Sequence, residues 1–191
     1  GGINTYGYVG ADPSTHVDPS GLSWCTKDFV DHYLSGSGAA VDLTGIGLIG
    51  AFRNHASVAG PDAAWKGRLQ SRCERTGASL LSSCDCRGET KTAAFSDSNR
   101  INYDVTGAQP IGNCLWSVGR GSVFGSASCF VYADCLTKKV RWMCTVKYRG
   151  RDKFEEPLRI SSWGIDIKGE IPRARVYDIL IGWEDFISGG N

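Results

Sequence analysis

CFVYADCLTKKVRWMCTVKY, residues 129–148, alternates apolar residues with more variable ones along most of its length. A period of two is the pattern of a β-strand that has one face in the core and the other in water. Thr137–Lys139 interrupts the alternation and predicts a turn, so we expect an antiparallel β-hairpin. Its apolar face comprises Cys129, Val131, Ala133 and Cys135 before the turn, and Val140, Trp142, Cys144, Val146 and Tyr148 after it.

Strands are also expected on the C-terminal side of this hairpin. Ile165–Ile167 and Val176–Ile181 are short apolar runs, and Gly169 and Pro172 between them are typical of a turn. Residues 188–191 are predicted to be a loose tail. On the N-terminal side, residues 82–113 are polar and rich in Gly and Ser, which indicates a loop or a weakly paired strand.

Short helices are expected before the sheet. Residues 24–34 have an amphipathic pattern that Ser35–Gly38 ends. A second helix is expected to start at Asp42–Thr44, although the glycines that follow weaken it. A third begins at Pro61–Asp62 and stops at Gly77, with one buried face made of Trp65, Leu69 and Cys73. Helices followed by an antiparallel sheet predict a cysteine-rich α+β fold.

The composition is that of a globular domain with an appendage. The chain has 191 residues, of which 41% are hydrophobic and 10% aromatic, enough to build a core. The longest apolar candidate, Val41–Phe52, is shorter than the roughly 18 residues of a membrane helix, and no signal peptide is expected. A net charge of +1 makes a nucleic-acid partner unlikely.

Eight cysteines are the compositional anomaly. An even number in a chain of this size favours disulfide bonds and an oxidising compartment. Buried free thiols and a zinc site are the alternatives, and zinc is disfavoured because the chain lacks a pair of Cys-x-x-Cys motifs. No metal or cofactor is expected, and the sequence does not give the pairing.

The first 22 residues, GGINTYGYVGADPSTHVDPSGL, have a different character from the rest. They contain an Asn-x-Tyr-x-Tyr segment (residues 4–8), then Asp12-Pro13, then Asp18-Pro19-Ser20-Gly21-Leu22. This succession closely resembles the end of the core of Rhs/YD-repeat proteins. We therefore expect residues 1–22 to be the end of that core, and residues 23–191 to be a separate C-terminal domain.

The resemblance implies a function for both parts. In that family an upstream β cocoon encloses the C-terminal domain, and an aspartyl-protease-like site cuts the chain after the leucine, here between Leu22 and Ser23. Asp18 matches one aspartate of that site, and its partner would lie before Gly1, so this chain is not expected to cleave itself. The released domain would be a secreted toxin used in competition between bacteria. Its partners would be the upstream shell and a cognate immunity protein.

Residues for chemistry in the C-terminal domain are few. His32 and His55 are its histidines, and an imidazole suits acid–base catalysis near neutral pH. Arg53 precedes His55 by two positions and Asp31 precedes His32, so the candidate catalytic residues are His55, Arg53, His32 and Asp31. The acids Asp152, Glu155, Glu156 and Asp178 are expected to be solvated surface charges, although a pair of them would suit glycosidic cleavage.

Two further segments raise alternatives. The basic run TKKVRWMCTVKYRGRDK (residues 137–153) has aromatic residues among its cations, a combination found in RNA-binding proteins. Its alternation instead places Trp142 and Tyr148 on the apolar face and most cations on the other. The glycine-rich GIGLIG (residues 45–50) would suit lipid insertion, but an ordinary buried segment is favoured.

The expected function is therefore that of an Rhs toxin domain acting on the target cell envelope, from the periplasm. Eight cysteines and a nearly neutral charge favour that compartment. One alternative is a cytosolic toxin enzyme that acts on nucleic acid or NAD, of nuclease or ADP-ribosyltransferase type. Another is a pore former without enzymatic activity. The sequence does not decide whether the domain is an enzyme.

Overall fold

The computed structural model describes residues 26–85, 88–106, 114–154 and 175–191. Residues 1–22, with the expected cleavage site at Leu22–Ser23 and its aspartate Asp18, lie outside these ranges. So do the expected strand Ile165–Ile167 and the acids Glu155 and Glu156.

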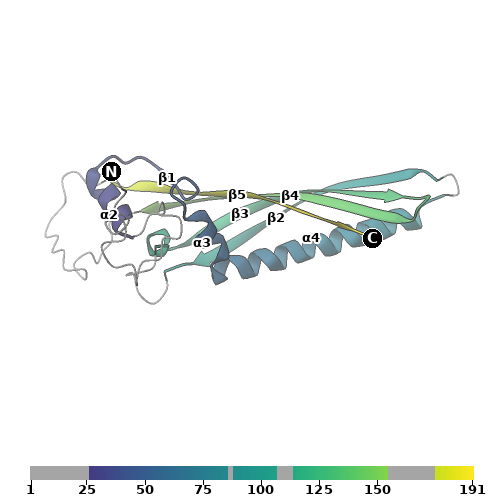
Figure 1. The fold of residues 1–191 in the computed structure, drawn as a ribbon, viewed down its shortest axis with the longest axis horizontal. Coiled ribbons are helices and arrows are strands. Elements are labelled where there is room, and N and C mark those ends of the chain that lie inside the picture. Colours follow the sequence, from purple (N-terminus) through teal and green to yellow (C-terminus); the bar gives the residue numbers. More distant parts are fainter. Residues whose placement is uncertain (1–25, 86–87, 107–113, 155–174) are drawn as a thin grey trace, which may run out of the picture.

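A long β-sheet with one long helix along it makes up most of the molecule (Figure 1). The sheet has the strand order β1-β5-β4-β3-β2. The four long strands pair with one another in antiparallel fashion, whereas the two-residue β1 pairs in parallel with β5. The chain is therefore α+β, as expected from the sequence. The elements are α2 (Thr26–Ser35), β1 (Val41–Asp42), α3 (Ile49–Asn54), α4 (Ala56–Ser82), β2 (Thr90–Asp104), η1 (Trp116–Val118), β3 (Arg120–Asp134), β4 (Lys139–Phe154) and β5 (Tyr177–Gly190).

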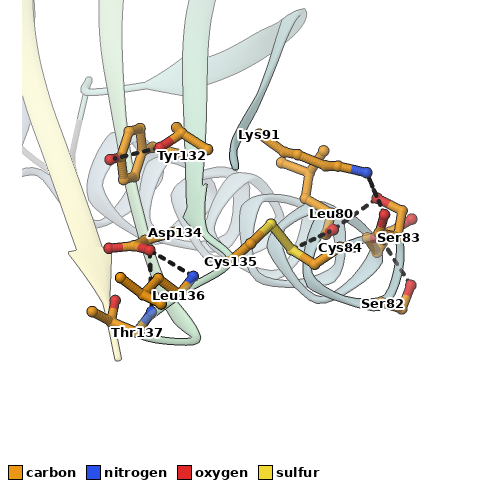
Figure 2. The surroundings of a disulfide bond; sticks show 12 residues. Leu80, Ser82, Ser83, Cys84, Lys91, Tyr132, Asp134, Cys135, Leu136 and Thr137 are labelled. Atoms are coloured by element: carbon orange, nitrogen blue, oxygen red, sulfur yellow. Dashed lines mark hydrogen bonds between the residues drawn. A yellow bond between two sulfur atoms is a disulfide. The ribbon is translucent and has the colours of Figure 1, made fainter. Parts of the chain in front are cut away.

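The hairpin predicted from the alternating segment is present as β3 and β4. Its turn lies where expected, with Lys138 in the left-handed region at φ 58°. Asp134 accepts hydrogen bonds from the backbone N–H groups of Leu136 and Thr137, which closes the turn (Figure 2). Along β4, the residues from Val140 to Tyr148 alternate between buried and less buried positions, so one face of the sheet belongs to the core.

Helix α4 is longer than the sequence indicates, because neither expected boundary is real. It begins after His55, whose Nδ1 accepts a hydrogen bond from the Ser57 backbone N–H, and it passes through Pro61. It also passes through Gly77, which was expected to end it. A Cβ at Gly77 would lie 2.4 Å from Val140 Cγ1, so glycine is required there by the close approach of helix and sheet. The predicted buried face of Trp65, Leu69 and Cys73 is confirmed.

Strand β2 was not predicted as a strong strand. It pairs with β3 over its full length, from Thr90 opposite Asp134 to Asp104 opposite Arg120. It lies at the edge of the sheet, and its inward residues are mostly half-buried, with Ile101 and Tyr103 buried at one end. An edge strand with such shallow burial needs few apolar residues, which is why its polar composition resembled a loop.

The segments around β1 and β5 also differ from expectation. Val41–Asp42 forms a strand rather than a helix start, and the helix begins later, at Ile49. Ile46 and Leu48 of the glycine-rich segment belong to the core, as the favoured interpretation predicted. Strand β5 continues to Gly190, so the tail is not loose. Its last residue is tied down, because the Val140 backbone N–H donates to Asn191 Oδ1 at 3.0 Å.

Candidate functional site

Four charged side chains meet on the core side of the sheet, between α3, α4 and β5. We call Arg53, Asp62, Lys66 and Asp185 the charged centre. Asp62 and Lys66 are four residues apart on α4, which puts them on one face of the helix. Asp185 faces the helix because its neighbours Trp183 and Ile187, two residues away on either side, pack against the core.

Ion pairs join all four members of the charged centre. Arg53 Nη2 lies 2.5 Å from Asp185 Oδ1. Lys66 Nζ lies 2.6 Å from Asp185 Oδ2 and 2.7 Å from Asp62 Oδ2, so one ammonium group bridges both carboxylates. The side chains of Asp185, Asp62 and Lys66 are 15%, 16% and 22% exposed, against 39% for Arg53. Arg53 is therefore the member that reaches furthest towards solvent.

Aromatic rings surround these charges and supply further hydrogen bonds. The Tyr148 hydroxyl donates to Asp62 Oδ1, and Trp183 Nε1 donates to Asp185 Oδ2 at 3.2 Å. The rings of Tyr148 and Trp183 are stacked at 4.1 Å between centroids. Arg53 lies 5.6 Å from the centre of the Trp183 ring, close enough for a cation–π contact.

The electrostatics fix the charge state of the centre at neutral pH. Burial raises the pKa of Asp185, but hydrogen bonds and charge from Lys66 and Arg53 outweigh it, so that pKa lies below its ordinary value. Burial lowers the pKa of Lys66, yet its bonds to Asp185 and Asp62 raise it above the ordinary value. Burial and the bond to Asp62 raise the pKa of Tyr148. Asp185 is thus ionised, Lys66 is charged and Tyr148 is a neutral donor.

This charge state limits the chemistry available. A general acid in glycosidic cleavage needs a carboxyl group with a raised pKa, and the pKa of Asp185 is shifted the other way. The partly exposed guanidinium of Arg53 has N–H groups beyond the one that binds Asp185, and a guanidinium is well suited to a carboxylate or phosphate. Asp185 is therefore not suited to donate a proton near neutral pH, and Arg53 is the member of the centre whose exposure and chemistry suit contact with an anionic group.

The predicted catalytic residues fall in different places. Arg53 belongs to the charged centre. His55 caps α4 instead: its Nδ1 lies 2.9 Å from Ser57 Oγ, and Ser57 in turn donates to the backbone oxygen of Asp104. His32 and Asp31 lie on α2, where His32 Nε2 is 2.9 Å from the Ala39 carbonyl oxygen. These contacts give His55 and His32 local structural roles, and their catalytic role stays a prediction.

The other members of the centre were missed by the sequence reasoning. The spacing of Asp62 and Lys66 carries a signal, since oppositely charged residues four apart pair on a helix. Asp185 gives no such signal, because its ion-pair partners Arg53 and Lys66 are more than a hundred positions away in sequence. Of the acids considered from sequence, Asp152 accepts from the Tyr103 hydroxyl at 3.2 Å and Asp178 pairs with Arg151.

Disulfide bonds are the second feature that bears on the function, because they depend on the redox state of the compartment. Cys84–Cys135 joins the end of α4 to the end of β3 (Figure 2), across a sequence separation of 51. Cys129–Cys144 joins directly opposed residues of β3 and β4, and Cys114 is disulfide-bonded as well. The expectation of disulfide bonds is confirmed.

Cys73 is the free cysteine among the described residues, and it is buried on α4. Its Sγ lies 3.6 Å from Sγ of Cys144. The sulfurs of Cys73, Cys129 and Cys144 form the one metal-type ligand cluster found in the described part of the chain. Two of these sulfurs are bonded to each other, so only the Cys73 thiol is left as a ligand while that disulfide is intact.

Comparison of the chain with family models, with curated proteins and with solved structures gives no significant match. Within the described residues, no helix is long and apolar enough to cross a membrane.

Proposed function

We propose that residues 23–191 are the C-terminal toxin domain of an Rhs-type protein, and that this domain acts on the envelope of a target cell from an oxidising compartment. The proposal of an oxidising compartment rests on two disulfides, Cys84–Cys135 and Cys129–Cys144. Such bonds persist in the periplasm and are rare in a reducing cytosol. The toxin assignment rests on the resemblance of residues 1–22 to the end of an Rhs core.

The positions of the bonds support this proposal, because each bond closes a loop and should stabilise the folded domain. Closing loops of 51 and 15 residues stabilises a folded chain by about 4 and about 3 kcal/mol in the chain-entropy model. A typical domain has a net stability of about 5–15 kcal/mol. The domain would therefore lose much of its stability in a reducing cytosol and regain it where disulfides form.

The charged centre is the proposed working site for an anionic group of the envelope. Arg53 presents a partly exposed guanidinium that is ion-paired with Asp185, and Lys66 pairs in turn with the other oxygen of Asp185. In this proposal the upstream shell keeps the domain enclosed until cleavage after Leu22, and an immunity protein protects the producer.

Expression of residues 23–191 in a susceptible bacterium, with and without a periplasmic export signal, tests the compartment. The proposal predicts killing only with export, and loss of killing in the Cys84→Ser, Cys135→Ser variant. Killing only without export would favour the rival, a cytosolic enzyme acting on nucleic acid or NAD. Harmless expression in both compartments would contradict the toxin assignment, provided that the protein accumulates.

The assignment of residues 1–22 as the end of an Rhs core has a test of its own. In the full-length parent protein, Asp18→Ala should abolish cleavage, and N-terminal sequencing of the fragment released by the unaltered protein should begin at Ser23. A fragment that begins elsewhere, or unchanged cleavage in the Asp18 variant, would contradict the assigned site.

A further inference from the structure

The sheet has a second face, which points away from the core. The alternation of each strand puts even-numbered residues of β3 and odd-numbered residues of β4 on this outer face. Large apolar side chains are exposed there: Phe186 is 77% exposed, Met143 63%, Phe124 58% and Phe130 46%. No described element packs over them. Exposed apolar side chains gathered in one place mark an interaction surface.

Three of these residues and the exposed Tyr132 are neighbours across three strands of the outer face. Phe130 on β3 lies directly opposite Met143 on β4. Phe186 on β5 lies opposite Thr145, which makes it the diagonal neighbour of Met143, and such neighbours are within reach of an aromatic side chain. Tyr132 follows Phe130 on the same face of β3. We call Phe130, Tyr132, Met143 and Phe186 the apolar patch.

Cations lie beside the apolar patch on both sides. Arg141 is opposite Tyr132 at one end. At the other end, Arg100, Lys147 and Arg149 line a hollow of about 530 Å³ together with Phe124. Lys147 is 3.5 Å from Glu184, whereas Arg149 has no ion-pair partner among the described residues.

The same combination recurs at the tip of the hairpin. Leu136 is 78% exposed and is followed after one residue by Lys138 and Lys139. Apolar side chains with cations on either side thus extend along the outer face from the hairpin tip to the hollow. A surface that pairs apolar side chains with cations fits an anionic lipid surface, where side chains enter the boundary of the acyl region and cations meet phosphates.

We propose that the outer face binds an anionic phospholipid bilayer, with the apolar patch at the acyl boundary and Arg100, Arg141 and Arg149 at the lipid phosphates. Charge complementarity favours a bilayer as the partner. Its phosphates would contact the cations of the outer face, and its hydrocarbon, just beneath the phosphates, would contact the apolar patch. A nucleic acid would match the cations but would leave Met143 and Phe186 in water. The binding itself does not rest on the proposed function, which supplies only the place where the lipid is met.

Co-sedimentation of the oxidised 191-residue chain with vesicles tests the proposal. The probes are vesicles of phosphatidylethanolamine with phosphatidylglycerol, and vesicles of phosphatidylcholine alone. We expect binding to the first that weakens as salt is raised, and much weaker binding to the second. Binding to neither kind of vesicle would overturn the proposal.

Two variants and a matched control assign the binding to this face. Arg100→Gln with Arg149→Gln should weaken binding about 25-fold, at roughly fivefold per cation. Met143→Ser with Phe186→Ser should weaken it at least tenfold on both kinds of vesicle. The control, Arg68→Gln with Arg75→Gln, removes the same charge from exposed positions of α4 and should bind like the unaltered chain. Equal losses in the control would overturn the proposal.

A parallel titration with single-stranded RNA separates lipid from nucleic acid. Tight RNA binding that the arginine variant loses and the Met143, Phe186 variant keeps would overturn the proposal in favour of a nucleic-acid surface. All substituted side chains are exposed, so circular dichroism and thiol counts should match the unaltered chain. Killing from the periplasm without vesicle binding would refute the lipid proposal and leave the proposed function standing.

Discussion

The two faces of the sheet are made by the same strands but have opposite properties. On the inner face, Trp142, Cys144 and Val146 of β4 are at most 7% exposed. The four members of the charged centre on that side are joined to one another by ion pairs. On the outer face of the same strand, Met143 is 63% exposed and Arg149 has no ion-pair partner among the described residues. The comparison shows that the inner face provides the buried contacts that stabilise the fold, whereas the side chains of the outer face are exposed and available for binding.

The largest expected difference between the faces concerns a lysine. Lys66→Met removes the cation that bridges Asp62 and Asp185, and leaving partly buried carboxylates without it should cost about 3 kcal/mol of unfolding free energy. The matched change on the outer face, Lys147→Met, removes a pair with Glu184 whose two side chains are 54% and 40% exposed, and should cost less than about 1 kcal/mol. Urea unfolding of the two variants measures both values. Equal losses of unfolding free energy would show that the two faces do not differ in this respect.

Helix packing on the inner face gives the next largest effect. Gly77→Ala places a methyl group against Val140 and should destabilise the protein by about 1–3 kcal/mol. In the same helix, nothing lies within 4 Å of a Cβ at Gly67, so Gly67→Ala should stabilise by up to about 1 kcal/mol. Thermal unfolding distinguishes the two signs. If Gly77→Ala were neutral, α4 would not approach the sheet as described.

Acid should weaken the inner face through Asp185. Its folded pKa is lower than its unfolded pKa, which is about 4. Its contribution is therefore present above pH 4 and is lost as pH falls through the folded pKa. Asp185→Asn should be less stable than the unaltered chain at pH 7, and the two unfolding free energies should converge below pH 4. A constant gap across this range would show that Asp185 is not held ionised by its partners.

The smallest expected change in unfolding free energy comes from two exposed residues on the outer face. Met143→Ser with Phe186→Ser replaces side chains that are already exposed, so the unfolding free energy should change by no more than about 0.5 kcal/mol per site. Chemical denaturation at neutral pH measures this. A loss of several kcal/mol would mean that these residues contribute to the fold itself.

The sulfur cluster on the inner face gives a prediction that does not depend on stability. In the oxidised chain, Cys73 should react with a thiol reagent only after unfolding, because it is buried and its pKa is raised by burial. In Cys129→Ser, the freed Cys144 should pair with Cys73, whose sulfur lies 3.6 Å away. Mass-spectrometric mapping of the peptides checks the new bond. Two unpaired thiols under the same oxidising conditions would contradict this geometry.

Some of this organisation could be predicted from the sequence because it is local. The alternation around Thr137–Lys139 predicts the hairpin, and the spacing of Trp65, Leu69 and Cys73 predicts the buried face of α4. Gly77 was misinterpreted because a glycine that ends a helix and one that lets a helix approach a sheet look the same in sequence. For β2 the sequence left a loop and a weakly paired strand as alternatives, because an edge strand can be as polar as a loop.

The candidate site was only partly predictable for a different reason. Arg53 was picked out because it lies in a polar cluster near His55, but its main partner, Asp185, lies 132 positions away. The disulfide pairing could not be predicted either, since eight cysteines allow many connectivities. Contacts of this kind depend on the order of strands in the sheet, which no short segment specifies.

The central claim is that contacts on the inner face stabilise the domain, while the outer face binds the lipid of the target envelope. Killing by the exported Met143→Ser, Phe186→Ser variant tests it most directly. The account predicts that killing falls at least tenfold while the unfolding free energy stays within about 0.5 kcal/mol per site of the unaltered value. Killing at the unaltered level, by a variant that has lost vesicle binding, would contradict it.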